Sequence, residues 1–255
     1  MLQTPIAAAA ARIVSVDGQP YELRACVGNA PSRGIYVEGN EANDNASPQG
    51  FLVTQPPFSI TRPHFHETNQ FQVFVSGSGA FGKKPAAPLT VQFAAGHTPY
   101  GPIRAGAGGI MYFTLRQRWD PGAKYMPQMR DKLSRGQQRQ RLVPAPELLR
   151  RPALQHTVDT RVQTLLPCEA DGLMAALWTL GPNTHVALPD ADDGGGQYHI
   201  VVNGILEGMR DTVKDAPEPL PRWSCQYAFP SDGVVTLRAS DAGAQVLVLR
   251  FPKLD

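Results

Sequence analysis

Two histidines separated by one residue carry the clearest chemical signal in this 255-residue sequence. His64 and His66 lie in the segment RPHFHETNQFQVFVSGSG, and on a β-strand residues two apart point to the same face. A carboxylate is expected just downstream to complete a divalent-metal site, but Gln70 stands there. An amide oxygen is an uncharged and weaker ligand, so the pattern indicates either a metal centre with altered chemistry or the remains of one.

The elements that must position this pair are predicted to be short strands. The sequence contains 24 Gly and 24 Pro, which favours strands joined by turns over long helices. Runs of Val, Ile, Leu and aromatic residues recur between turn residues, as in QFQVFVSG, LTVQFAAG, GIMYFTLR, YHIVVNGILEG and AQVLVLRF. This spacing predicts a β-sandwich or β-barrel rather than alternating strands and helices.

The two halves of the sequence resemble each other. Gln, six residues and Gly occur at Gln70–Gly77 and again at Gln197–Gly204. Gly, six residues and Arg occur at Gly109–Arg116 and at Gly243–Arg250, in the same order along the chain. Two matches in register indicate an internal duplication.

The segment between the halves has a different composition. Residues 120–155 are polar, basic and contain Pro, which predicts a connector with a helical turn near Gln128–Leu133. No aromatic residues alternate with its charges, so a solvated linker is preferred over an anion-binding patch. We therefore expect an N-terminal barrel with an N-terminal arm over 1–125, a connector over 126–155, and a C-terminal barrel over 156–255.

Together these features resemble the cupin superfamily, and specifically a two-barrel bicupin. The first cupin motif has His-x-His, three or four residues, Glu, six residues and Gly. His64, His66, Gln70 and Gly77 keep that spacing, with only the acid changed. The resemblance implies an all-β fold of duplicated double-stranded β-helix (jelly-roll) barrels. It also implies a divalent transition metal, such as Fe, Mn, Ni or Zn, in the first barrel.

The second cupin motif, which would supply the last ligand, matches less well. It corresponds to FAAGHTPYGPIRAG, where Tyr100 takes the place of the family's last histidine and His97 lies three residues earlier. His97 would make a three-histidine centre competent for oxygen activation or Lewis-acid chemistry, with Gln70 as a fourth group. Tyr100 would instead ligate as a phenolate or hydrogen-bond a substrate. Glu67 is a further alternative for the missing carboxylate, if a bulge turns it inward.

Four residues are the predicted substrate contacts: Arg62, Gln72, Tyr100 and Arg104. Either arginine could hold a carboxylate by paired hydrogen bonds, although a surface position is the plainer interpretation of each. Gln72 shares the parity of Gln70 along the next strand, so both should face the barrel interior.

The second half lacks the metal motif, because its His-x-His positions fall on Ala191 and Asp193. Gln197 and His199 share one parity, and a hydrogen-bonded interior histidine is preferred over a metal ligand for His199. The acidic run that begins at Asp190 lacks the alternating acids and bidentate Glu of an EF-hand loop, so we expect a solvated turn there.

Composition narrows the partners and the compartment. A net charge of +2 argues against a nucleic-acid partner, and no apolar run approaches the length of a membrane span. Cys26, Cys168 and Cys225 show no disulfide or metal spacing; we expect buried, reduced thiols and a cytoplasmic protein. The N-terminus lacks the basic and long apolar regions of a signal peptide. We expect a small-molecule partner and a homodimer.

Three functions are compatible with these expectations. The resemblance implies a metal-dependent enzyme, with a dioxygenase-like oxidoreductase as its sharpest form. A non-enzymatic small-molecule binder or sensor with a vestigial metal site is the alternative, favoured by Gln70 and by the degenerate second barrel. A storage-type bicupin is disfavoured, because such proteins are usually secreted and rich in amide residues.

Overall fold

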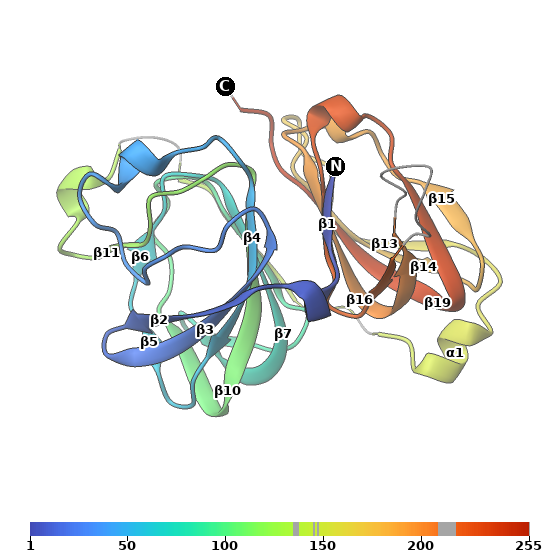
Figure 1. Ribbon diagram of the computed structural model, residues 1–255, viewed down its shortest axis with the longest axis horizontal. Helices are drawn as coiled ribbons and strands as arrows, with labels where there is room; N and C mark the ends of the chain where they lie inside the picture. The colour runs from blue at the N-terminus through green and yellow to red at the C-terminus, as the bar shows by residue number, and fades with distance from the viewer. Residues whose placement is uncertain (135–137, 145, 147, 209–217, 255) are drawn as a thin grey trace. The chain divides into compact units, whose positions relative to one another are not determined.

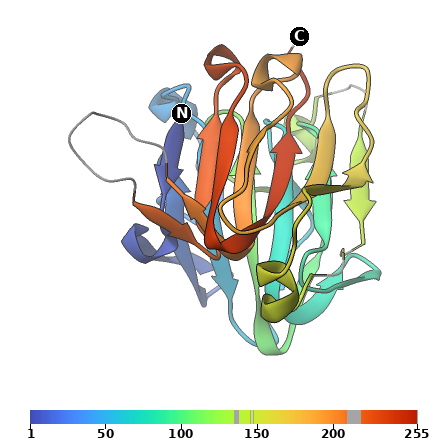
Figure 2. The same ribbon diagram turned by 90° about the vertical axis from the view of Figure 1, so that its right-hand side faces the viewer.

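The computed structural model describes residues 1–134, 138–144, 146, 148–208 and 218–254. The chain divides into two compact units, one of Ala10–Ala145 and the other of Met1–Ala9 with Pro146–Asp255. We call them the N-terminal barrel and the C-terminal barrel. Each is built mainly of antiparallel β-strands, which confirms the predicted all-β bicupin fold (Figures 1 and 2).

The N-terminal barrel is built on one large antiparallel sheet with strand order β12-β9-β7-β10-β4-β3-β2. Strand β5 adds to β10, β8 adds to β7, and β11 pairs separately with β6. The elements are β2 (Ala11–Val16), β3 (Gln19–Val27), η2 (Asn40–Asn43), β4 (Gln49–Gln55), β5 (Ile60–Thr61), β6 (His64–Phe65), β7 (Gln70–Phe81), β8 (Lys84–Ala86), β9 (Val91–Ala94), β10 (Ile103–Arg116), β11 (Lys124–Tyr125), η3 (Arg130–Lys132) and β12 (Gln140–Val143).

The C-terminal barrel repeats this plan with strand order β1-β18-β16-β19-β14-β13, with β15 added at β19 and β17 at β16. The elements are β1 (Leu2–Thr4), η1 (Ile6–Ala8), α1 (Arg151–Gln155), β13 (Arg161–Leu166), β14 (Met174–Leu180), β15 (His185–Ala187), η4 (Ala191–Asp193), β16 (Gln197–Glu207), β17 (Pro219–Pro221), β18 (Cys225–Ala228), η5 (Pro230–Asp232) and β19 (Thr236–Arg250).

The internal duplication appears in the register of the central strands. Gln70 of β7 lies opposite Arg116 of β10, and Gln197 of β16 lies opposite Arg250 of β19. The two sequence repeats are therefore the same strand pair in each barrel.

The repeated glycines mark a close approach of two backbones. Gly77 has a φ of +77°, and a Cβ there would lie 2.2 Å from the carbonyl oxygen of Gly109. Gly204 has a φ of +70°, and its Cβ would lie 2.1 Å from the carbonyl oxygen of Gly243. Only a residue without a side chain fits at either position, which explains why glycine recurs in both halves.

Two short strands shift the predicted boundaries. The N-terminal arm belongs to the C-terminal barrel, because β1 pairs with β18. Inside the predicted connector, β12 pairs with β9 and extends the N-terminal sheet, and η3 supplies the predicted helical turn. Connector residues 135–137, 145 and 147 lie outside the described part. In both cases the backbone of a short segment hydrogen-bonds to the free edge of a sheet. Amino-acid composition does not indicate which segments form such pairs.

The three cysteines are free thiols. Cys26 and Cys225 are buried as predicted, and burial raises the pKa of Cys26 to about 12. The predicted burial is wrong for Cys168, which is exposed and whose Sγ lies 3.1 Å from Nη2 of Arg250. Its turn follows β13 at the barrel surface, where the local sequence carries no burial signal.

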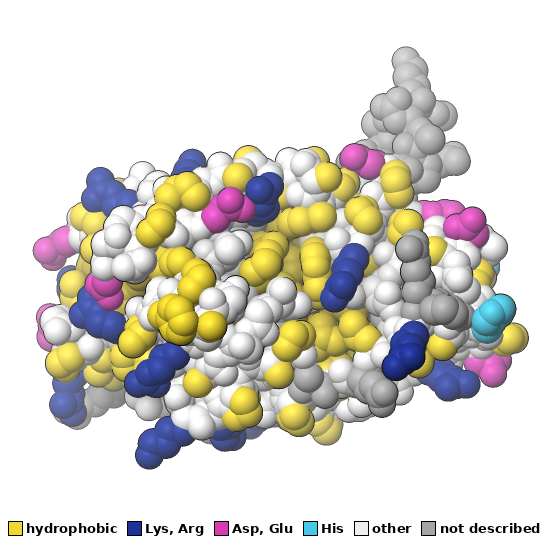
Figure 3. All heavy atoms as spheres, turned by 90° about the horizontal axis from the view of Figure 1, so that it is seen from below, with side chains coloured by type: hydrophobic (Ala, Val, Ile, Leu, Met, Phe, Trp, Pro, Cys, Tyr) yellow, Lys and Arg dark blue, Asp and Glu magenta, His cyan; other side chains and the backbone are white. Residues whose placement is uncertain are grey.

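The surface adds little to these expectations. Within the described residues, no helix combines the length and apolar character needed to cross a membrane. On the face shown in Figure 3, Lys and Arg side chains are dispersed among hydrophobic and uncharged ones. The homodimer and the cytoplasmic location stay predictions.

Candidate functional site

His64 and His66 meet inside the N-terminal barrel, as their strand parity predicts. Both imidazoles are buried, and their ring centroids lie 5.2 Å apart. A bridge between His64 and Tyr100 fixes the segment. Nδ1 of His64 lies 2.7 Å from the carbonyl oxygen of Arg62, which can only accept, so Nδ1 carries the proton and Nε2 keeps its lone pair.

His66 is held on both sides by charged groups. Its Nδ1 lies 2.6 Å from Oδ1 of Asp120 and donates to it. Nη2 of Arg116 lies 3.1 Å from Nε2 and 3.3 Å from Nδ1 of this ring, so the guanidinium packs against the face of the imidazole. A metal ion bound at Nε2 would therefore lie beside a fixed positive charge.

Arg116 extends this contact into a network. It ends β10 between Gln49 of β4 and Gln70 of β7, and donates to the amide oxygens of both at 2.9 Å. The amide nitrogen of Gln70 then donates to the hydroxyl oxygen of Tyr100. A continuous network of polar contacts thus runs from Asp120 to Tyr100.

Asp120 supplies the negative charge of the network. Its side chain is fully buried and accepts from the backbone N–H groups of Glu67 and Gly122, each at 2.9 Å. Burial alone would raise the pKa of Asp120, but His66, Arg116 and these donors hold it well below its usual range. The carboxylate stays ionised and balances the guanidinium.

Burial keeps the neighbouring side chains uncharged. It lowers the pKa of His64 to about 3, with a further contribution from nearby His66. Burial and then Arg116 lower the pKa of His66, while burial raises the pKa of Tyr100. A phenolate at Tyr100, one of the predicted ligand forms, is therefore disfavoured.

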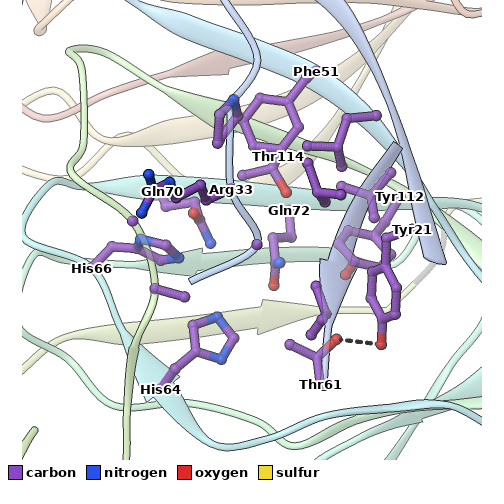
Figure 4. A pocket seen from close by; sticks show the side chains of 18 of the residues that line it. Tyr21, Arg33, Phe51, Thr61, His64, His66, Gln70, Gln72, Tyr112 and Thr114 are labelled. Atoms are coloured by element: carbon purple, nitrogen blue, oxygen red, sulfur yellow. Dashed lines mark hydrogen bonds between the residues drawn. The ribbon is translucent and has the colours of Figure 1, made fainter. Parts of the chain in front are cut away.

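A cavity of about 80 Å³ opens beside the network. Figure 4 shows Gln72 pointing into it, between the His66–Gln70 side and the hydrogen-bonded Tyr21–Thr61 pair. Apolar and aromatic side chains make up most of its wall, including Val14, Val16, Leu23, Phe51, Val53 and Tyr112. One water needs about 10–15 Å³, so the cavity accommodates several waters or the polar end of a small organic molecule.

The structure brings together five of the predicted site residues around this cavity: His64, His66, Gln70, Gln72 and Tyr100. It does not bring His97 to them. The ring of His97 packs at a tilt beside Phe65, and its Nδ1 accepts from the backbone N–H of Ser134 at 3.2 Å. A positive φ of 56° at His97 helps turn it away, so the predicted three-histidine centre is not assembled.

The two predicted substrate arginines lie outside the cavity lining. Arg62 forms a half-exposed ion pair with Asp17 at 2.7 Å, and Arg104 donates to the carbonyl oxygen of Gly82 at 3.4 Å. Both therefore follow the plainer surface interpretation.

The side-chain nitrogen and oxygen atoms of the predicted ligands are not arranged to bind a divalent metal in this structure. Arg116 donates to Oε1 of Gln70 at 2.9 Å and places its positive charge 3.1 Å from Nε2 of His66. Glu67, the alternative carboxylate, pairs with Lys124 at 2.8 Å. Across the described part of the chain, no three His, Cys, Asp or Glu side chains are grouped to hold a metal ion.

Sequence reasoning missed Arg116, Asp120 and Gln49. Arg116 closes the repeated pattern Gly109–Arg116 and has inward parity, which is the signal that could have identified it. Asp120 and Gln49 carry no comparable signal, because only strand pairing and the loop after β10 bring them to the histidines.

The acidic run of the C-terminal barrel forms a turn, as predicted, and the structure adds a side-chain cap. Oδ1 of Asp190 accepts from the backbone N–H of Asp192 at 2.9 Å, at the start of η4. Asp193 pairs with Arg250 at 3.1 Å. These carboxylates are used within the turn and at the barrel end.

His199 is interior, as predicted, but it lacks the predicted hydrogen bond, and it gives the fold a dependence on pH. Neither ring nitrogen reaches a hydrogen-bond partner in the described structure, and burial lowers the pKa of His199 to about 4. The unfolded chain, with a pKa near 6.5, binds the extra proton between about pH 6.5 and 4, so stability falls as pH falls through that window. Between pH 7 and pH 4 we expect the wild type to lose about 2–3 kcal/mol more than His199→Phe.

Urea unfolding at several pH values measures this difference. The remaining titrating groups are shared by the two proteins, so the gap between their curves isolates His199. Parallel curves for wild type and His199→Phe would contradict the prediction.

Comparison with known proteins gives matches in structure alone. No family model matches the sequence, and no curated protein matches it. A protein of Nostoc punctiforme, provisionally described as a dioxygenase, superposes with a TM-score of 0.60 at 11% identity, covering 97% of this chain and 81% of its own. Lactobacillus farciminis oxalate decarboxylase, in a formate complex, gives 0.56 at 9% identity, covering 99% and 86%.

A third similar structure is the Escherichia coli pirin YhhW in complex with nickel(II). Its TM-score is 0.53 at 10% identity, and the match covers 99% of each chain. At such identities these similarities establish the fold, which extends over both barrels.

Proposed function

The chain has the bicupin fold, and from the contents of its first barrel we propose that it binds a small, neutral, hydroxylated organic molecule. The observation that supports this most directly is Gln72. Its amide Oε1 is buried beside the cavity and has no hydrogen-bond partner in the described structure. An unpaired buried polar atom costs about 1–3 kcal/mol, and a bound hydroxyl group would remove that cost.

The charge and polarity of the cavity favour a neutral ligand. Asp120 and Arg116 balance each other, and both histidines are uncharged at neutral pH. Tyr100 accepts from Gln70, so its own O–H is left to donate. The apolar wall suits the carbon skeleton of such a molecule.

The site is proposed to bind its ligand without converting it, because neither histidine is suited to act as a general base. A useful general base has a pKa near the working pH, whereas the pKa of His64 is lowered to about 3. The pKa of His66, the other base, is also lowered, by burial and by the adjacent Arg116. These features support a binder or sensor in which the site holds its ligand unchanged.

Phenol and toluene, which differ by a hydroxyl and a methyl group, test the proposal. We expect phenol to bind and raise the melting temperature more than toluene. Gln72→Met should weaken phenol binding by about tenfold, the equivalent of one hydrogen bond, and leave toluene unchanged. Calorimetric titration measures both affinities.

Gln92→Met is the matched control, because Gln92 is also buried and lies opposite Gln72 but does not line the cavity. It should leave the preference for phenol intact. Equal effects of both substitutions, or no phenol binding by any of the proteins, would overturn the proposal.

A metal-dependent oxidoreductase, in its sharpest form dioxygenase-like and using Fe, Mn, Ni or Zn, is the second candidate. It is favoured by Nε2 of His64, which keeps its lone pair beside the cavity, and by the nickel-bound pirin of similar fold. Its test is the metal content of protein purified without chelators or a His tag. About one equivalent, lost in His64→Ala, would support the enzyme over the binder.

A further inference from the structure

Arg116 is a buried cation at the point where two predicted metal ligands meet. Its side chain is 2% exposed, its Nε donates to Oε1 of Gln70 at 2.9 Å, and its Nη2 packs on the face of His66, 3.1 Å from Nε2 and 3.3 Å from Nδ1. Oε1 of Gln70 and Nε2 of His66 are the atoms through which the two residues would bind a metal, since Nδ1 of His66 donates to Asp120. One fixed positive charge thus lies about 3 Å from both atoms that a metal ion would need.

The charges of the site are also balanced without a metal. The carboxylate of Asp120 lies 4.0 Å from Nη1 of Arg116 and 2.6 Å from the imidazole of His66. Gln70 accepts from the guanidinium without adding a second negative charge. A divalent ion would bring uncompensated positive charge into a buried space, which costs several kcal/mol.

We propose that Arg116 takes the place of a metal ion in the N-terminal barrel, and that removing it converts the barrel into a transition-metal site. Arg116→Met would remove the positive charge beside Nε2 of His66, while Nε2 of His64 already keeps its lone pair. Imidazole centroids 5.2 Å apart allow both nitrogens to approach one ion at the usual bond length of about 2.0–2.1 Å. Gln70→Glu would add a charged ligand and restore the balance of charge.

The role of Arg116 does not depend on whether the cavity binds an organic molecule.

Metal retention tests it in four chelator-stripped proteins at pH 8: the wild type, Gln70→Glu, Arg116→Met and the double variant. Each is incubated with NiCl₂ or ZnCl₂, desalted and analysed for metal by mass spectrometry. We expect the double variant to retain about one equivalent more than the wild type, and nickel to raise its melting temperature. Gln70→Glu alone should gain nothing, because the new carboxylate would pair with the guanidinium.

Two controls separate this site from surface histidines. His66→Ala in the double-variant background should remove the gained equivalent. Arg250→Met changes the arginine at the same register of the C-terminal barrel, where it donates to Gly172 and Asp190 carbonyl oxygens, and should gain no metal.

A measurement on the wild type covers the case in which the double variant fails to fold. Titration with MnCl₂, which broadens nearby NMR signals, should leave the ring signals of His64 and His66 sharp. Broadening at micromolar manganese would overturn the inference, and so would a folded double variant that retains no more metal than the wild type.

Discussion

Replacing Asp120 with asparagine is expected to lower the free energy of unfolding by about 3–5 kcal/mol at pH 7. The substitution keeps the shape of the side chain but removes the negative charge opposite Arg116, which is buried at 2% exposure. It also weakens the contact to His66, whose Nδ1 lies 2.6 Å away. A buried cation without its counter-charge is far more costly than the loss of one hydrogen bond.

Urea unfolding measures the effect, with Asp17→Asn as the control. Asp17 pairs with Arg62 at 2.7 Å, but both side chains are about 40% exposed, so its loss should cost about 0–1 kcal/mol. Similar costs for the two substitutions would contradict the view that the Asp120–Arg116 pair holds the polar end of the barrel together.

Replacing Gly77 with alanine is expected to lower the free energy of unfolding by about 3–4 kcal/mol. The new Cβ would lie 2.2 Å from the carbonyl oxygen of Gly109 on the paired strand, so β7 and β10 would have to separate. The positive φ of +77° adds about 1 kcal/mol of backbone strain.

Gly18→Ala provides a control matched in backbone conformation. Gly18 has a φ of +79°, but nothing lies within 4 Å of the position its Cβ would occupy. It should therefore cost only the strain of about 1 kcal/mol. The difference between the two variants in chemical unfolding isolates the steric term. An equal loss of unfolding free energy in the two variants would show that the paired strands β7 and β10 tolerate a methyl group at Gly77.

The local sequence pattern was sufficient to predict which side chains face the barrel interior. Alternation along a strand placed His64 and His66 on one face, and Gln70 and Gln72 on another, and the structure directs all four to one cavity. Two-residue periodicity is a property of any extended chain, so it holds whatever the strand packs against.

The repeated spacing of Gln, Gly and Arg residues also predicts the internal duplication from the sequence alone. Gly77 and Gly204 occupy equivalent positions because the same close approach of two paired strands in each barrel excludes a side chain. A steric requirement of this kind leaves its mark directly in the sequence.

The identity of the third partner at the histidine pair was decided by tertiary structure. The segment from Gly96 to Gly101 left both His97 and Tyr100 open as that partner, and a left-handed backbone at His97 turns its side chain away. Backbone direction in a loop depends on what the loop must connect, which the short segment does not encode.

The sequence by itself therefore determined two β-barrels, an inward histidine pair and a missing carboxylate. Only the tertiary structure showed that the guanidinium of Arg116 packs on His66 and donates to Gln70, with Asp120 balancing its charge. The reason is physical: parity assigns a side chain to a face, but which buried charges meet there depends on strand register and loop path across distant parts of the chain.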